Sequence, residues 1–365
     1  MRKILSVLAV LSAAFQLNAG TIDSLPDSVF VGNQPFHVQG IALDREAGCF
    51  YLSFTSEFLK VDFKGNVIGS LTGIPGHLGA MTFDPVGRKV YASLEYKDDE
   101  IGTNITDKLK VDGIKKGESV FYIAEIDVDK INSVGMDQKG ILRNIDMPEV
   151  CSDYAVHRFG CSGIDGVTIG PALGASRRAQ RIARGRILSQ PRYLYIAYGI
   201  YGDNNRSDND YQIILCYRLG DFSRPVEKYF IFTGNTTYGV QNMAYDPYTG
   251  KVFMAVYKGK KPQYPNYSLY AFKMDQRPFK AELKGCPEAG IQHQLRLDSD
   301  GLSDPATGIT GWNFKHGSTG FCPIGDGYFY ISEKGRDPRT KTNSSNVRLY
   351  RWTGNADAPF EKVNR

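Results

Sequence analysis

Short apolar runs, each followed by a turn rich in Asp, Gly or Pro, succeed one another along most of this chain. The stretch at 73–96, GIPGHLGAMTFDPVGRKVYASLEY, reads as a turn, a short strand, an Asp-Pro-x-Gly turn and a second strand. Runs of this kind, bounded by turn residues, are typical of antiparallel strands. No segment between them shows a convincing helical periodicity of apolar residues. The pattern predicts an all-β chain.

The same pattern of strand, turn and strand recurs along the chain. HVQGIALDREAGCFYLSF at 37–54 aligns with HLGAMTFDPVGRKVYASL at 77–94 without a gap. The other copies are GVQNMAYDPYTGKVFMAV at 239–256, HGSTGFCPIGDGYFYISE at 316–333, and a copy split between GIDGVTIGP at 163–171 and RYLYIAYG at 192–199. Further strand-like segments, such as VFYIAEIDV and YQIILCYRL, follow the copies. Each unit is therefore expected to be a three- or four-stranded antiparallel meander.

A single meander cannot bury both of its faces, whereas a closed ring of meanders can. We therefore predict a single β-propeller domain over 20–365, with five blades by direct count. A sixth blade stays open at 286–312, where the strand character is weaker, and a β-sandwich is the structural alternative. We expect the N-terminal SVFVGN or the C-terminal PFEKVN to supply the outer strand that closes the ring. The largest loop excursions are expected at 97–117 and 172–191.

The first residues, MRKILSVLAVLSAAFQLNAG, have the layout of a secretory signal peptide, with two basic residues, an apolar run and small residues near Ala19. We expect residues 1–19 to be cleaved and the protein to be secreted or periplasmic. No later apolar run is long enough to span a bilayer, so no membrane insertion is expected. An oxidising destination permits disulfides, and Cys151 and Cys161, which flank a short loop, are the best candidate pair among the six cysteines.

Composition and charge limit the classes of partner. The 365 residues are 42% hydrophobic and 23% charged, which is ordinary for a folded globular protein. The formal net charge of +5 is small for this length, so no nucleic-acid partner is predicted. We expect a monomer that binds a small molecule or a glycan. The sequence has no serine nucleophile elbow, P-loop, dinucleotide-binding turn or zincin motif, so any chemistry must be assembled from loops of different blades.

The repeated G-x-x-x-D-x-x-x-G-x-x-Y-x-x pattern resembles that of secreted β-propellers with NHL-type or gluconolactonase-type repeats. The chain is also similar to uncharacterised exported bacterial propeller proteins that carry CSGIDGVTIGP and YGIYGDNNRSDNDYQ, which occur here at 161–171 and 198–212. The resemblance covers most of the chain after the signal peptide, and it implies the fold. It implies no catalytic residues, because the propeller repeat hosts many activities.

Three of the five histidines occupy one equivalent position in the repeat alignment, just before the innermost strand: His37, His77 and His316. Innermost strands line the axial channel of a propeller, and ring closure makes the last blade a neighbour of the first. We therefore predict that the three imidazoles converge at one mouth of the channel and, with Gln241, bind a divalent metal ion (Zn, Mn or Ca). Metal-dependent propeller lyases that act on acidic sugars are a distant parallel, because they use axial histidines with a glutamine. Alternatively, the histidines cap strand ends and hydrogen-bond water or neighbouring backbone.

Polar side chains occur two positions further along three of the copies, at Gln39, Asp165 and Gln241, where they would complete a metal shell or hold water. Glu95 ends a second strand, near the same mouth by the repeat alignment. We predict that Glu95 and Asp165 are the catalytic carboxylates, with Glu95 as a general base. The alternative for Glu95 is a surface carboxylate paired with Lys or Arg.

Three further polar segments are candidates for ion binding. The Asp-rich turns GDNNRSDND at 202–210 and DSDGLSD at 298–304 suit Ca²⁺ by their density of oxygen ligands, although neither has EF-hand spacing. Asn, Asp and Gly also dominate ordinary turns. The Arg-rich run SRRAQRIARGR at 176–186 interrupts one repeat copy and is either an anion-binding loop or a solvated surface.

Two functions are consistent with these features. The first is a metal-assisted exported lyase or hydrolase that acts on a carbohydrate or an anionic small molecule. The second is a non-catalytic propeller that binds a glycan or a protein through its loops. Convergence of all three histidines on a cavity with a carboxylate nearby would favour the enzyme. Two close histidines, with the third in a blade interface, would favour the binding module.

Overall fold

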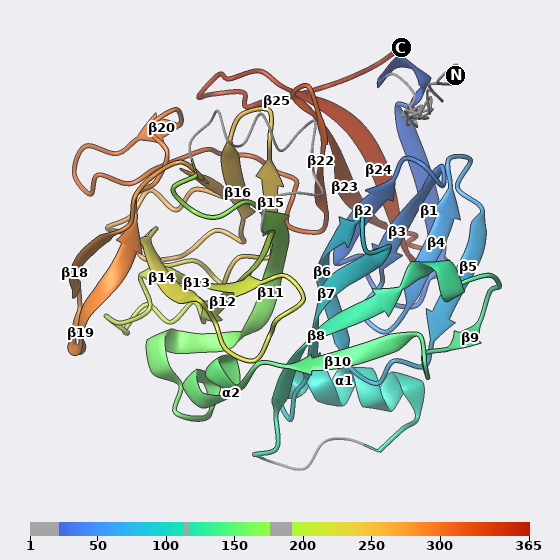
Figure 1. Cartoon of the computed structure of the whole chain (residues 1–365), viewed down its shortest axis with the longest axis horizontal. Helices are drawn as coiled ribbons and strands as arrows, with labels where there is room; N and C mark the ends of the chain where they lie inside the picture. Colours follow the sequence, from blue (N-terminus) through green and yellow to red (C-terminus); the bar gives the residue numbers. More distant parts are fainter. Residues whose placement is uncertain (1–21, 113–116, 176–191) are drawn as a thin grey trace, which may run out of the picture.

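The computed structural model describes residues 22–112, 117–175 and 192–365. Its strands form five blades around a central axis (Figure 1). The innermost strand of each blade packs against the innermost strands of both neighbouring blades, and the last packs against the first. The ring is therefore closed, and the predicted five-bladed β-propeller is confirmed.

The blades follow the chain in order, each running from its inner to its outer strand. Blade 1 contains β2 (Gly40–Asp44), β3 (Cys49–Ser53), β4 (Phe58–Asp62) and β5 (Val67–Thr72). Blade 2 contains β6 (His77–Asp84), β7 (Lys89–Tyr96), β8 (Val120–Asp127) and β10 (Leu142–Asp146). Blade 3 contains β11 (Cys161–Gly170), β12 (Tyr193–Ile200), β13 (Tyr211–Arg218) and β14 (Glu227–Phe232). Blade 4 contains β15 (Asn242–Asp246), β16 (Lys251–Ala255) and β17 (Leu269–Lys273), and blade 5 contains β22 (Phe321–Gly325), β23 (Tyr328–Arg336) and β24 (Asn343–Trp352).

Both ends of the chain close the ring, where the sequence suggested one or the other. Strand β1 (Ser28–Gln34) pairs antiparallel with the first half of β24. Strand β25 (Phe360–Lys362) pairs with the last residues of β24. Blade 5 is thus built from both ends of the described chain, and Arg365 pairs with Asp27, just before β1, at 2.7 Å.

The segment at 286–312 adds strands to existing blades, and the described residues contain no sixth blade. Strands β18 (Phe279–Leu283) and β19 (Cys286–Leu295) form a hairpin that joins blade 3 through parallel pairing of β19 with β14. The two-residue strands β20 (Leu302–Ser303) and β21 (Thr310–Gly311) pair with each other beside β17. In blade 1, β9 (Met136–Asp137) extends the sheet by parallel pairing with β5.

Two short α-helices interrupt the strands, and the sequence analysis missed both. Helix α1 (Glu100–Leu109) follows β7, inside the excursion predicted at 97–117, and the Asp99 side chain caps it by accepting from two backbone N–H groups. Helix α2 (Pro148–Ala155) leads into β11. Single 3₁₀ turns are η1 (Ile22–Ser24), η2 (Val128–Lys130) and η3 (Arg158–Gly160). None of the helices in the described residues is long and apolar enough to cross a membrane.

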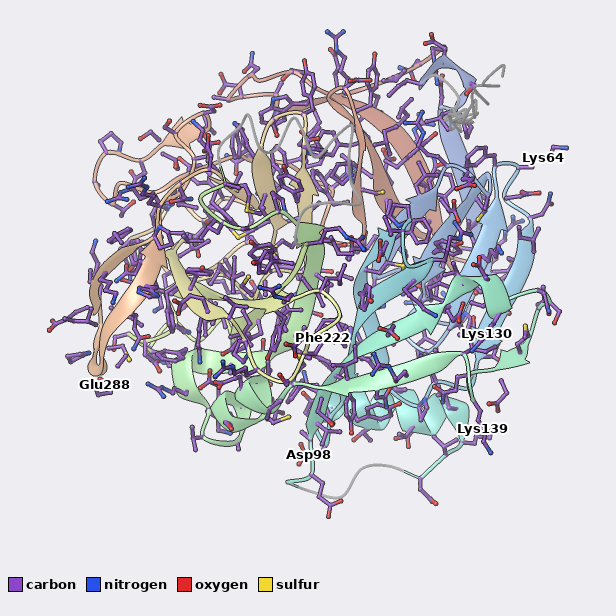
Figure 2. The ribbon with its side chains drawn as sticks, in the orientation of Figure 1. Lys64, Asp98, Lys130, Lys139, Phe222 and Glu288 are labelled. Atoms are coloured by element: carbon purple, nitrogen blue, oxygen red, sulfur yellow. The ribbon has the colours of Figure 1, made fainter. Side chains whose placement is uncertain are left out.

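The apolar core is divided into five clusters, one in each space between neighbouring blades. Aromatic rings meet across these spaces: Phe253 of blade 4 lies 5.6 Å from Phe329 of blade 5, centroid to centroid. Phe222, labelled in Figure 2, belongs to the turn after β13 and packs against Tyr91 of blade 2, with ring centroids 5.9 Å apart. Each blade therefore depends on its two neighbours for burial.

The Asp of the repeat pattern has a structural role between blades. Asp44 and Asp84 are the last residues of β2 and β6 and are almost fully buried. Arg88 of blade 2 reaches back to Asp44 with a contact of 2.7 Å, and Arg192 of blade 3 pairs with Asp84 in the same way. A buried carboxylate needs such a partner.

The predicted disulfide is wrong. All six cysteines are free in the structure, including Cys151 and Cys161. Cys161 is fully buried in the cluster between blades 2 and 3, and Cys151 packs against the same cluster. Both thiols thus behave as small apolar side chains. The predicted signal peptide at 1–19 and the Arg-rich run at 176–186 lie outside the described residues.

Because β1 closes the ring, substitutions on its buried face should destabilise the protein more than substitutions on its exposed face. Val29 and Val31 are 2% exposed and belong to the cluster between blades 1 and 5, whereas Phe30 between them is 62% exposed. The double change Val29→Ala and Val31→Ala should lower the free energy of unfolding by about 2–4 kcal/mol, because it removes buried methyl groups. Urea unfolding would measure this. Phe30→Ala is the matched control, and an equal loss in that variant would contradict the assignment.

Candidate functional site

The inner strands begin at one end of the axial channel, and both α-helices lie at that end. His77 begins β6 and pairs in register with Glu95 near the end of β7, after which the chain enters α1. Figure 1 shows α1 and α2 on the same side of the molecule, and Figure 2 shows Asp98 on that side as well. We call this end of the channel the mouth.

Polar side chains just inside the mouth form hydrogen bonds from one blade to another. Gln241 of blade 4 donates to the Asp165 carboxylate of blade 3 over 2.9 Å. Asn242 donates to the backbone carbonyls of Gln39 in blade 1 and Ser318 in blade 5, over 2.9 and 3.0 Å. The residues that the repeat alignment placed at one level are thus close together in the structure.

His37 and His77 meet at the amide of Gln39. The Nε2 atom of His37 lies 2.7 Å from the Gln39 amide nitrogen, and the Nε2 atom of His77 lies 3.0 Å from it. Burial lowers the pKa of His77 to about 3, with the charge of Lys97 acting in the same direction. Burial also lowers the pKa of His37, helped by Lys334 and Lys108. Both imidazoles are therefore neutral at pH 7 and can accept a hydrogen bond.

A buried ion-pair network lies directly behind His77. Glu95 and Lys97 are 4% and 6% exposed, and their charged ends are 3.7 Å apart. Lys97 also pairs with Asp99 at 3.2 Å and donates to the Ser162 carbonyl of blade 3 over 2.9 Å. Lys97 thus connects Glu95 near the end of β7, Asp99 at the start of α1 and the Ser162 carbonyl of blade 3.

Asp165 is the second carboxylate of this network. Burial raises its pKa from an ordinary 3.8 to about 7, although Lys97 and the hydrogen bond from Gln241 oppose the shift. Burial likewise raises the pKa of Glu95, opposed by Lys97 and reinforced by the negative charge of Asp165. The two carboxyl groups come from adjacent blades and feel each other's charge, so they titrate as a pair.

Gly163 makes room for Glu95. Its φ is +121°, a backbone conformation that favours glycine, and a Cβ placed there would lie 2.0 Å from the Glu95 Oε1 atom. Gly163 is the blade 3 counterpart of His77 in the repeat alignment. A histidine at this position would exclude the carboxylate, so the missing side chain is part of the site.

The described residues do not bring the three predicted histidine ligands together as one group. The described residues contain no group of three or more His, Cys, Asp or Glu side chains that could hold a metal ion. The His316 ring instead lies against Phe314 and Tyr350 of blade 5, with centroids 6.0 and 6.4 Å away. The physical reason is the looser repeat here: β22 begins at Phe321, whereas His77 is itself the first residue of β6. The predicted ligand Gln241 binds Asp165.

The two Asp-rich turns do not form calcium sites either, since their carboxylates have protein partners. Asp208 pairs with Arg206 at 2.7 Å, and Asp210 pairs with Lys261 at 2.8 Å. In the second turn, Asp298 and Asp300 both pair with Lys251, at 3.0 and 2.6 Å. The positive charges that neutralise these turns are lysines and arginines of neighbouring strands and turns.

Sequence reasoning placed Glu95 and Asp165 at the mouth, and the structure brings them together. It missed Lys97, which joins them, and it treated Gln39 only as an accessory ligand. The charged run at 95–100, with one lysine among four acidic residues, is the signal that could have found Lys97, because a buried lysine needs an acidic partner.

The fold and the site together define a five-bladed β-propeller with a carboxyl pair and two neutral imidazoles at the channel mouth. No protein-family model matches the chain, and no curated protein matches it. Among solved structures, a gluconolactonase from Xanthomonas campestris matches over 89% of this chain and 91% of its own, with 10% identity and a TM-score of 0.36. No residue role is carried from that protein to this chain.

The raised pKa of Asp165 predicts how stability varies with pH. The folded state keeps a proton on this carboxyl between about pH 4 and 7, where the unfolded state has lost it, so the free energy of unfolding should fall as the pH rises through this window. Asp165→Asn removes the titration, and its free energy of unfolding should exceed that of the native protein by about 1–2 kcal/mol at pH 8. Urea unfolding at pH 5 and pH 8 tests this. Exposed Asp137→Asn is the control, and a parallel pH dependence of native and Asp165→Asn proteins would refute the assignment.

Proposed function

We propose that this protein is a hydrolase or lyase that acts on a carbohydrate or a related anionic small molecule at the channel mouth, with Glu95 and Asp165 as its acid–base pair. The observation that carries the proposal is the buried carboxyl pair itself. Two carboxyl groups on adjacent blades share an environment that raises both pKa values, and that of Asp165 reaches about 7. An acid–base group works best when its pKa lies near the working pH.

The roles within the pair follow from the surroundings. Lys97 lowers the pKa of both carboxyls and so favours one negative charge in the pair; we assign that charge to Glu95, which pairs with Lys97 at 3.7 Å, as the member that accepts a proton. Asp165, whose pKa is about 7, then holds the proton and donates it to a leaving oxygen. A pair that holds one proton at neutral pH supplies an acid and a base at once.

The rim of the mouth favours an anionic substrate. Lys108 and Lys334 both act on His37 through their charge, so both lie near the exposed edge of the site. The Nε2 atoms of the neutral His37 and His77 already accept from the Gln39 amide, so the lysines are the groups that would meet the substrate. Tyr238 is 39% exposed and meets Tyr257 edge to face, with Lys334 over the Tyr257 ring at 5.2 Å. Aromatic faces beside lysines suit a sugar ring that carries a carboxylate.

A divalent metal ion belongs to the function expected from the sequence, and the residues present do not fit the ligand set predicted for it. Two imidazole Nε2 atoms meet at Gln39, but His316 lies against Phe314 and Tyr350. We therefore assign every step to the side chains of the chain. We also propose export to the periplasm or the extracellular space, on the basis of the layout of residues 1–19.

Glycan binding without catalysis is the second candidate function. His37 and His77 are close together and His316 is not with them, which by the criterion given for the histidines favours binding, whereas the carboxyl pair favours the enzyme. The arrangement of His37, Gln39 and His77 is that of hydrogen-bonded strand ends, and the pair of tyrosines on the rim could hold a sugar by itself. The two candidates differ in what the Asp165 carboxyl does. A binding module would tolerate a neutral amide there, whereas an enzyme would not.

The decisive variants are Asp165→Asn and Glu95→Gln, assayed on sugar lactones, esterified sugars and acidic oligosaccharides. Each should lower kcat by about 10²- to 10⁴-fold with little change in KM, because each removes a proton-transfer group and keeps the side-chain shape. Native kcat should decline above about pH 7 as Asp165 loses its proton, and Asp165→Asn should lack this decline.

Acid release followed by pH titration detects hydrolysis, and ultraviolet absorbance of an unsaturated product detects elimination. Exposed Asp137→Asn should keep native rates. Native protein that binds an acidic oligosaccharide, turns over none of the panel and keeps its affinity in Asp165→Asn would establish the binding module instead.

A further inference from the structure

A small cavity lies between blade 2 and helix α1, behind the carboxyl pair. Its volume is about 10 Å³, and its lining includes His77, Glu95 and Lys97 from the blade and Gly102, Ile105 and Thr106 from the helix. A volume of this size, measured by the positions open to a water-sized sphere, is about what one water molecule needs. The cavity is therefore too small for any substrate and suited to a single water.

Two residues that line this cavity carry polar side-chain atoms that no protein group satisfies fully. The Glu95 Oε1 and His77 Nδ1 atoms are both buried and lack a hydrogen bond of good geometry, although the Ile164 N–H of blade 3 is near enough to the Glu95 carboxylate to lower its pKa. Glu95 as a whole is 4% exposed, so bulk solvent does not reach its carboxylate. Buried polar atoms in native proteins are nearly always satisfied, and ordered water is the usual partner where protein groups are absent.

We infer that this cavity binds one water molecule, that Glu95 activates it as the nucleophile, and that the reaction is therefore a hydrolysis. The inference rests on the proposed function and narrows it, because an elimination by a lyase consumes no water. The water would donate to Glu95 and bind His77, with the Lys97 ammonium close by.

The reaction balances with the water and the two carboxyl groups of the site. An O–H bond of the water breaks, and its proton passes to Glu95. The water oxygen forms a bond to the electrophilic carbon of an ester, lactone or glycoside, and the bond from that carbon to the leaving oxygen breaks. Asp165 gives its proton to the leaving oxygen, so the two carboxyls exchange protonation states and the products carry one added water.

Helix α1 is the roof that keeps this water separate from bulk solvent. Asp99 fixes the start of the helix and also pairs with Lys97 at 3.2 Å. Gly102 packs so tightly that an added Cβ would lie 1.7 Å from the Lys97 carbonyl oxygen. Ile105 and Thr106 are buried on the same face, and the Thr106 hydroxyl donates to the backbone of α1 itself. The roof residues thus shape the cavity without competing for the water.

Two measurements test the inference. A high-resolution crystal structure of the full protein should show an ordered water at about 2.6–3.2 Å from the Glu95 Oε1 atom. Thr106→Leu fills the cavity and should lower kcat for hydrolysis at least tenfold, with KM unchanged. Thr106→Val keeps the cavity volume and should keep the native rate, and Asn104→Leu, on the exposed side of α1, is the matched control.

The outcomes separate this inference from the proposed function. A crystal structure with no water at Glu95, or a Thr106→Leu variant that folds and retains native kcat, would overturn the inference alone. Turnover by elimination, with an unsaturated product and no oxygen-18 taken up from labelled water, would also overturn it and leave the proposed function standing. An absence of turnover on every substrate would overturn both.

Discussion

The packing of each blade between two neighbours is the constraint on which the rest of the molecule depends. A single meander has two apolar faces and covers neither by itself, and here five separate clusters fill the spaces between blades. A ring with one open joint would expose two such faces at once, so closure is needed for every blade. The use of both β1 and β25 against β24 follows from this need.

The fold could be predicted because the residues that recur along the chain are those that form the strands and turns of the blades. The aspartates Asp44 and Asp84 recur because each accepts an arginine from the next blade. The parts that could not be predicted interrupt the repeat. Helix α1 has only ten residues, and its one helical signal is the spacing by four of Ile101, Ile105 and Leu109, which a search for strand repeats passes over. His316 could not be placed, because its position depends on the length of the loop before β22 and on the rings of Phe314 and Tyr350.

The location of the two carboxyl groups could be predicted from the sequence, but their protonation could not. The alignment placed Glu95 and Asp165 near one mouth, but it gave no reason for their protonation. That reason is a count of charges: three carboxyls, Glu95, Asp99 and Asp165, act on the single ammonium of Lys97. Asp99 is partly exposed, so Glu95 and Asp165 are the carboxyls that compete for the one cation, and an uncompensated buried charge is costly. The network therefore retains a proton on this pair.

The same packing that stabilises the ring also makes it a suitable frame for acid–base chemistry. Glu95 ends a strand of blade 2 and Asp165 lies in the inner strand of blade 3, so their separation is set by the apolar cluster between these blades and not by a flexible loop. Groups held by rigid elements lose little free energy in becoming ordered for reaction. The glycine at position 163, which leaves space for the Glu95 carboxylate, lies in that same inner strand. The interface between blades 2 and 3 thus sets the separation of the two carboxyl groups, their shared proton and the space that the Glu95 carboxylate occupies. The function proposed for the mouth therefore depends on the closure of the ring.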